Sequence, residues 1–405
     1  MRVRSFFLVL GKGKDTMFDL DRHVSRIGTN AIKWDVAGEG VIPMWVADME
    51  FPVPPAVQKA IADRAAHGIF GYSSIPENWA PAYAAWWKNR HGVTIQEDWL
   101  LFCPGIVPAI TSILRRTTHP GEKVLVMPPV YHMFFHSVMD AGCQVLNCPL
   151  SYEDAAYSID WEAMEKGLAD PLTTAMILCN PHNPSGNIWT KEELARLGEL
   201  CRKYHVLPIS DEIHCDLTAP GVSYVPFASA SETCRDISVT CIAPSKAFNL
   251  AGLQTAAVFA ADPLLREKIA QGLHADGLSM PNAFACIAAS AALEEGGAWL
   301  DELRAYLWQN RAMAESILKE KLPEARVIAS DATYLLWLDC TAFTHDSDAL
   351  KDFLQHEAGV LVNSGMPFGP GGEGFLRINL AAPADLIREG TERIVKGIRA
   401  FSERK

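Results

Sequence analysis

Three absences narrow what this chain of 405 residues can be. It has no run of about 18 consecutive apolar residues, so no membrane-spanning helix is expected. Positive charge is in deficit: the formal net charge is −12, and no basic cluster stands out, so neither nucleic acid nor an anionic membrane surface is an expected partner. There is no C-x-x-C pair and no cluster of Cys and His in the sequence, so no metal ion is expected.

The ten cysteines are spread from position 103 to position 340, and several lie inside apolar runs, as Cys179 and Cys241 do. This pattern indicates buried free thiols in a reducing, cytoplasmic compartment. We expect residues 1–16 to be an extension outside the fold. The apolar stretch 6–10 is too short for a signal peptide, and Lys12 and Lys14 follow it at once.

The order of the expected elements predicts an α/β fold with a mainly parallel sheet. The chain is also longer than a single core usually supports, so two domains are expected. Thr190 and Glu193 form a capping box that opens a helix with an apolar stripe, between two strand-like runs. The other expected elements are strands at 124–127, 174–179, 206–210, 237–242, 334–338 and 375–379, and a helix at about 106–114.

Polar residues follow three of these runs: Asn180, Asp211 and Lys246. Ligands of parallel sheets bind at the carboxyl ends of the strands, so we expect these side chains to converge on one site. Pro208 weakens this interpretation, because proline is uncommon inside a central strand.

Lys246 lies just after a β-run, in the small and apolar segment 243–252. Desolvation there lowers the pKa of a lysine, as a Schiff-base amine requires. A lysine after a strand is, however, more often a solvated loop residue. The segments 180–186 (NPHNPSG) and 210–214 (SDEIH) have ordinary interpretations too, as a turn before the capped helix and as an acidic strand end.

Together and in this order, the three segments resemble the class I/II aminotransferase superfamily of pyridoxal-phosphate (PLP) enzymes of fold type I. Residues 43–51 (PMWVADMEF), 70–73 (FGYS), 104–108 (PGIVP) and 211–214 (DEIH) are similar to the MalY/PatB group of cystathionine β-lyases, or cysteine-S-conjugate β-lyases. The resemblance runs from about residue 17 to the C-terminus. It implies a large PLP domain over 60–300, with a mainly parallel sheet of the seven-stranded type. It also implies a smaller α+β domain from 17–59 and 301–405.

The resemblance also implies roles for individual residues. Lys246 would hold PLP as a Schiff base and act as the catalytic base, and Asp211 would keep the pyridinium nitrogen protonated. Tyr72, also counted as catalytic, would reach the phosphate bound by a partner subunit, which implies a homodimer. The remaining cofactor contacts would come from Asn183 at the phenolic oxygen, Tyr131 on the ring, His214 near the phenolic oxygen, backbone N–H groups of Gly105, Ile106 and Val107 at the phosphate, and Ser245. Substrate contacts would come from Arg377 at the α-carboxylate, Trp45 and Ala47.

Some positions depart from the pattern of the superfamily. Ala243 stands where many aminotransferases have serine, and Gln254 stands where many have a phosphate-binding arginine. Both changes weaken the interpretation that the chain is similar to aspartate aminotransferases, and they leave open which residues contact the phosphate. Glu50 and Ala247 replace an aspartate and a hydroxyl residue.

The function that the resemblance implies is β-elimination from L-cystathionine or another cysteine S-conjugate, giving a thiol, pyruvate and ammonia. Two alternatives stay open. An aminotransferase would use the same motif residues and would instead return a proton to the cofactor. A PLP-fold protein that regulates a partner by contact is the third hypothesis, although no DNA-binding extension is present.

Overall fold

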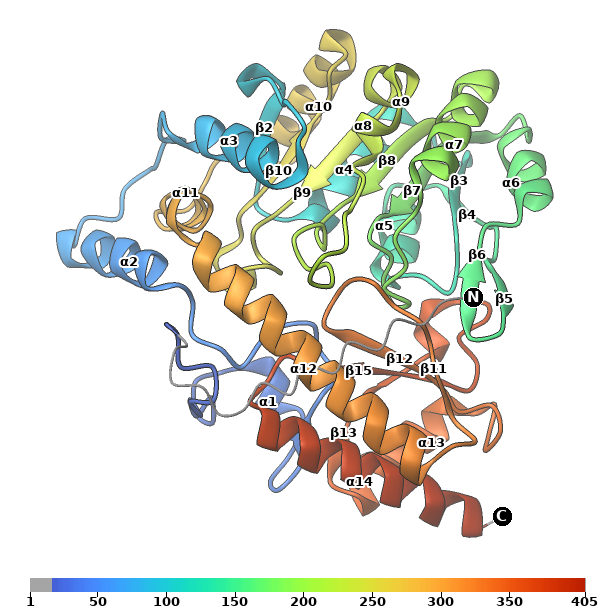
Figure 1. Ribbon diagram of the computed structural model, residues 1–405. Helices are drawn as coiled ribbons and strands as arrows, with labels where there is room; N and C mark the ends of the chain where they lie inside the picture. The colour runs from blue at the N-terminus through green and yellow to red at the C-terminus, as the bar shows by residue number, and fades with distance from the viewer. Residues whose placement is uncertain (1–16, 405) are drawn as a thin grey trace.

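A sheet of seven strands forms the centre of the larger part of the molecule in the computed structural model, which describes residues 17–404 (Figure 1). In spatial order the strands are β2 (Leu100–Cys103), β10 (Ala256–Phe259), β9 (Val239–Ile242), β8 (Leu207–Asp211), β7 (Thr173–Cys179), β3 (Lys123–Val126) and β4 (Gln144–Asn147). Strand β10 is antiparallel to both of its neighbours, and the other neighbouring pairs are parallel. The predicted α/β fold with a mainly parallel sheet is confirmed.

Both faces of this sheet are covered by helices, because alternate residues of each strand point to opposite sides. In β7, Ile177 joins the apolar cluster that contains Ile110, whereas Met176 and Leu178 join the cluster that contains Leu197. The helices of this part are α2 (Pro55–His67), α3 (Trp79–His91), α4 (Ile106–Thr117), α5 (Met133–Asp140), α6 (Trp161–Leu168), α7 (Lys191–Tyr204), α8 (Phe227–Ala230), α9 (Glu232–Ile237), α10 (Pro263–Ala275) and α11 (Ala285–Glu295).

A second sheet of four strands lies in the lower part of Figure 1, in the order β11 (Arg326–Val327), β12 (Leu335–Asp339), β15 (Phe375–Asn379) and β14 (Asn363–Ser364). Its helices are α12 (Gly297–Lys321), α13 (Ser347–Glu357) and α14 (Ala384–Glu403). Near the N-terminus, α1 (Ile32–Asp35) precedes β1 (Ile42–Pro43), which pairs in parallel with β13 (Val360–Leu361). The domain division at residue 300 stays a prediction, and that boundary falls inside α12.

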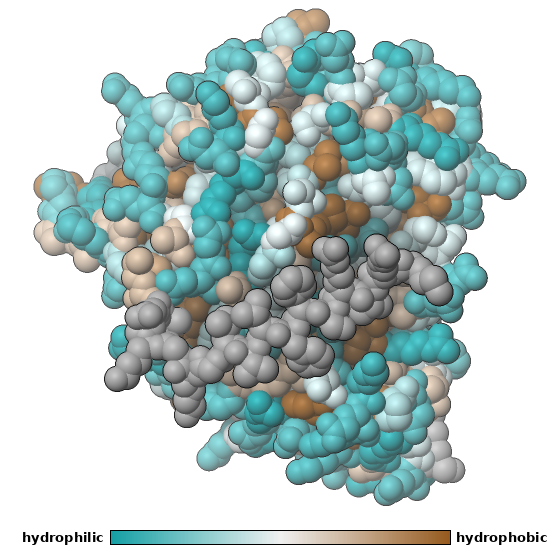
Figure 2. All heavy atoms as spheres, viewed as in Figure 1, coloured by the Kyte–Doolittle hydropathy of each residue, from teal (hydrophilic) through white to brown (hydrophobic). Residues whose placement is uncertain are grey.

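The smaller elements complete the description. A two-stranded sheet consists of β5 (Ser151–Glu153) and β6 (Ala156–Ser158), and there are short 3₁₀ helices at Glu97–Trp99, Ala251–Leu253 and Met366–Phe368. None of the helices within residues 17–404 has both the length and the apolar composition needed to cross a bilayer. On the face shown in Figure 2, hydrophilic residues dominate the surface and hydrophobic ones emerge in small groups.

Local sequence signals locate several elements well. The capping box of Thr190 and Glu193 is present at the start of α7, and β15 spans the predicted residues 375–379. Pro208 does lie in the central strand β8, but the pairing of β8 with β9 begins only at Ile209. The proline therefore lies ahead of the β8–β9 ladder, while on the other side it pairs with Met176 of β7. The predicted extension, residues 1–16, lies outside the described residues.

Candidate active site

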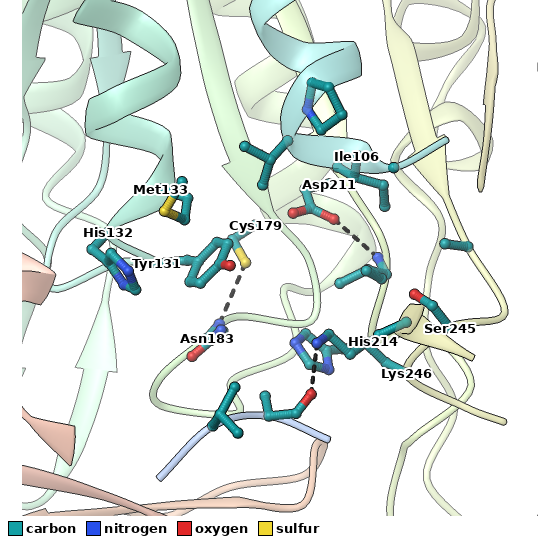
Figure 3. A pocket seen from close by; sticks show the side chains of 18 of the residues that line it. Ile106, Tyr131, His132, Met133, Cys179, Asn183, Asp211, His214, Ser245 and Lys246 are labelled. Atoms are coloured by element: carbon teal, nitrogen blue, oxygen red, sulfur yellow. Dashed lines mark hydrogen bonds between the residues drawn. The ribbon is translucent and has the colours of Figure 1, made fainter. Parts of the chain in front are cut away.

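A cavity of about 460 Å³ opens at the carboxyl ends of β7, β8 and β9, where the sequence placed the site. Side chains from both sheets and from the segment after β1 line it. Figure 3 shows Asp211, His214 and Lys246 among them. Twelve of the predicted site residues line it: Trp45, Ala47, Gly105, Ile106, Val107, Tyr131, Asn183, Asp211, His214, Ser245, Lys246 and Arg377.

Lys246 lines this cavity and is half-buried, and its Nζ donates a hydrogen bond to the backbone carbonyl of Ala47 at 2.6 Å (Figure 3). The Tyr334 hydroxyl donates to the same carbonyl at 3.0 Å. Burial, followed by the charge of Arg377, lowers the pKa of Lys246 to about 8, although Asp48 and Asp211 act in the opposite direction. A substantial fraction of the amine is therefore neutral near pH 8, as a nucleophile or a base must be.

Asp211 is the last residue of β8, and its carboxyl group is buried at the base of the cavity. Burial raises its pKa to about 7, while the backbone N–H of Ile213 and the charge of Lys246 oppose that rise. The Ile213 N–H donates to Asp211 Oδ1 at 3.1 Å. A cation bound beside this carboxyl would favour its ionised form, so the position suits a positively charged ring nitrogen.

Helix α4 begins at the cavity with Gly105 as its N-cap residue, and no side chain caps it. Gly105, Ile106 and Val107 all line the cavity. The first N–H groups of a helix have no partner within the helix and carry a partial positive charge, so this end suits an anionic group such as a phosphate.

Arg377 extends from β15 into the same space and is held by three oxygen atoms. Its guanidinium donates to Asn183 Oδ1 at 3.1 Å, to Asn363 Oδ1 at 2.7 Å and to the carbonyl of Trp45 at 3.2 Å. Burial lowers its pKa to about 10, which leaves it a cation at neutral pH. Its Nε has no partner within the described residues. A fixed planar cation of this kind suits a carboxylate ligand.

Two histidines of the cavity are neutral at pH 7. Burial, then the charges of Lys246 and Arg377, lowers the pKa of His214 to about 3. Burial, then Arg377 and His136, lowers the pKa of His132 to about 4. Each therefore offers one N–H donor and one acceptor to a bound molecule instead of a charge.

Tyr72 and Gln254, which the sequence analysis singled out, do not line this cavity. The Tyr72 side chain is 100% exposed and lies in a surface hollow with Phe70 and Phe284, so no described part of its own chain encloses it. Gln254 is not among the described residues that line the catalytic cavity, whereas Ala243 and Ser245 are.

Asn363 is a functional candidate that sequence reasoning missed. It pairs with Arg377 across β14 and β15 and accepts its shortest hydrogen bond, at 2.7 Å. Strand β14 has only two residues, so it has no periodicity to detect. The sequence assigned no role to Ile32 or Met133 either, and both line the cavity.

Comparison with known proteins gives concordant matches. A family model described as aminotransferase class I and II matches residues 39–394. The cystathionine beta-lyase PatB of Bacillus subtilis is 44% identical over 381 residues, which cover 93% of this chain and 98% of that protein. Cystalysin from Treponema denticola, solved with a pyridoxal 5'-phosphate cofactor, has a TM-score of 0.92 at 33% identity and covers 95% of this chain and 100% of its own. The PLP-bound C-S lyase from Staphylococcus hominis has a TM-score of 0.88 at 31% identity, with 94% and 99% covered.

Proposed function

Since the chain belongs to the class I and II aminotransferase family, we propose that it is a PLP-dependent carbon–sulfur β-lyase. Its substrates are L-cystathionine or other cysteine S-conjugates, and its products are a thiol, pyruvate and ammonia. The observation that carries the proposal is the 44% identity to a cystathionine β-lyase over 93% of the chain. An aminotransferase would share the cavity residues, so the outcome at the β-carbon is what separates the two activities.

The residues of the cavity fit PLP. Lys246 supplies an amine of lowered pKa for the aldehyde, and the buried Asp211 is suited to the ring nitrogen. The uncapped start of α4 is suited to the phosphate. Ser245 also lines the cavity and would be a second phosphate contact. Asn183 and His214 would contact the phenolic oxygen, and Tyr131 would stack on the ring. Bound PLP supplies an electron sink for the negative charge that develops at the substrate Cα.

The residues of this chain then have separate tasks. Arg377 binds the α-carboxylate of the substrate. Among the described residues that line the cavity, Lys246 and Arg377 are the Lys and Arg side chains, and Lys246 already has the role of base. Lys246 removes the proton from Cα. The bond between Cβ and sulfur breaks, and the electron pair leaves with the thiolate, which takes up a proton. Hydrolysis of the remaining three-carbon fragment gives pyruvate and ammonia.

The proposal includes a homodimer in which Tyr72 acts in the site of the partner subunit. Its support is the exposure of an apolar surface around that residue: Phe70 is 55% exposed and Met280 is 59% exposed. Exposed apolar surface of this kind is characteristic of subunit interfaces. We also propose a cytoplasmic location, which agrees with ten free and buried thiols.

Purified holoenzyme mixed with L-cystathionine and with S-alkyl cysteines tests the activity directly. Pyruvate and free thiol should appear in equal amounts without an added keto acid. Lys246→Ala should abolish both, whereas Lys268→Ala, at an exposed position of α10, should leave both unchanged. Conversion of the cofactor to its amine form, reversed only by a keto acid and without thiol release, would establish transamination instead.

A further inference from the structure

Apart from the catalytic cavity, three side chains of types that can ligate a metal ion lie close together, and the proposed reaction does not use them. Cys215 and Asp216 directly follow the segment that carries Asp211 and His214. His91, the last residue of α3, meets them from a distant part of the sequence. One ligand atom from each of these three residues lies within 4.8 Å of the other two. Within residues 17–404, no other group of three such side chains is this close together.

These three side chains open on a cavity of their own, of about 230 Å³. None of the described residues that line it also lines the catalytic cavity. The space can hold water, so an ion bound there would have room for a solvent ligand. The side chains of His91 and Asp216 are only 7% and 8% exposed, so the ligand atoms are shielded from bulk solvent.

The carboxylate of Asp216 is the centre of the group. It lies 3.0 Å from His91 Nε2 and accepts a hydrogen bond of 2.9 Å from the Trp86 indole. This carboxylate already has the outer hydrogen bond that ligating carboxylates usually have.

We propose that His91, Cys215 and Asp216 form a binding site for one divalent zinc-like cation. A nitrogen, a thiolate and a carboxylate oxygen are the donors that Zn²⁺ prefers, with a fourth position left to water. Ligand atoms bonded to Zn²⁺ at about 2.0–2.3 Å lie roughly 3–4 Å apart. The His91–Asp216 separation of 3.0 Å is already within that range, and the Cys215 thiol lies within 4.8 Å of both ligand atoms.

The charges around the cavity are compatible with such a cation. Arg90 and Arg304 also line it, but neither guanidinium is free. Arg90 is paired with Asp301 and donates to the carbonyl of Gly297. Arg304 donates to Thr218 Oγ1 and to two backbone carbonyls. When the ion binds, the Cys215 thiol loses its proton to solvent. The negative charges of the thiolate and of the Asp216 carboxylate then balance the two positive charges of the ion.

The position of the site connects it to the catalytic cavity through the chain. Residues 211–216 form one short segment that has Asp211 and His214 on the catalytic side and Cys215 and Asp216 on the other. A cation bound by Cys215 and Asp216 would therefore hold the same segment that carries Asp211 and His214.

Calorimetric titration of Zn²⁺ into metal-free holoenzyme tests the proposal without any assay of activity. One equivalent should bind, with release of about one proton, detected by repeating the titration in buffers of different ionisation enthalpy. Cys215→Ala, Asp216→Asn and His91→Gln should each weaken binding by at least about tenfold. Cys286→Ala, at another buried thiol, is the matched control and should bind as the wild type does.

Circular dichroism and the visible absorbance of the cofactor verify that each variant is folded and loaded. A wild-type protein that takes up no tight equivalent would overturn the proposal. So would binding that survives all three ligand substitutions, or a cavity that instead binds inorganic phosphate. Since these readouts report binding alone, they are independent of whether the β-lyase proposal holds.

Discussion

The amine of Lys246 donates to the carbonyl of Ala47 at 2.6 Å, although 199 positions separate the two residues. The segment that carries this carbonyl is fixed from several sides. Asn379 Nδ2 donates to the carbonyls of Val46 and Asp48 at 2.6 and 2.7 Å. Asn249, three residues after the lysine, donates to the carbonyls of Met49 and Phe51. The acceptor that holds the lysine is thus itself held in place by amide side chains.

This arrangement predicts that Asn379 positions Lys246 without touching it. Asn379→Ala should lower kcat by about tenfold or more with little change in KM, because Ala47 loses its fixed position. Asn310→Ala is the matched control, since Asn310 makes two bonds of the same kind to the carbonyls of Leu380 and Ala382. Both should lose roughly 1–3 kcal/mol of stability, measured by urea unfolding. Equal losses of kcat in the two variants would show that the effect is one of stability alone.

The lowered pKa of Lys246 predicts how its reactivity depends on pH. In protein freed of cofactor, acylation of this amine should rise with pH and reach half its maximum near pH 8, because only the neutral amine reacts. Mass spectrometry of the labelled peptide measures the rate. Arg377→Met should move the midpoint to higher pH, because it removes a positive charge that disfavours the ammonium form. An unmoved midpoint would mean that burial alone sets this pKa.

The raised pKa of Asp211 predicts opposite effects on stability and on cofactor binding. The folded protein binds a proton at Asp211 up to about pH 7, whereas an unfolded chain releases it near the usual value of about 4. The contribution of this group to the stability of the cofactor-free protein therefore falls as pH rises from about 4 to 7. Asp211→Asn should make the slope in thermal unfolding shallower, leaving the part that comes from Glu212, whose pKa burial also raises to about 7. It should nevertheless weaken PLP binding, because asparagine cannot pair with a protonated ring nitrogen. An unchanged affinity for PLP would remove Asp211 from its proposed role.

The exposure of Tyr72 predicts complementation between subunits. Lys246→Ala and Tyr72→Phe proteins should each be weakly active or inactive alone. After mixing and reassembly, about half of the dimers contain one subunit of each kind, with one intact site per mixed dimer. Thiol release should then recover to about a quarter of the wild-type rate. No recovery, despite subunit exchange verified by native mass spectrometry, would contradict action of Tyr72 across the interface.

Many residues of the catalytic cavity were predictable because they lie in short segments at the ends of strands. Asp211 ends one buried central strand and Lys246 follows another, and parallel strands bring their carboxyl ends to one edge. The resemblance of the segments around them then indicated both the cofactor and the family. These features depend on local periodicity and on residue order, which a sequence states directly.

Only the tertiary structure decided which residues support these groups. Asn363 reaches Arg377 from a strand of two residues, and Ala47 meets Lys246 through a backbone carbonyl, which no side-chain pattern can indicate. The group of His91, Cys215 and Asp216 was invisible for the same reason, because His91 lies far from the other two in the chain. Sequence spacing specifies ligands that share a helix, a strand or a loop. Ligands from separate elements meet only because the packing of buried apolar faces fixes where those elements lie.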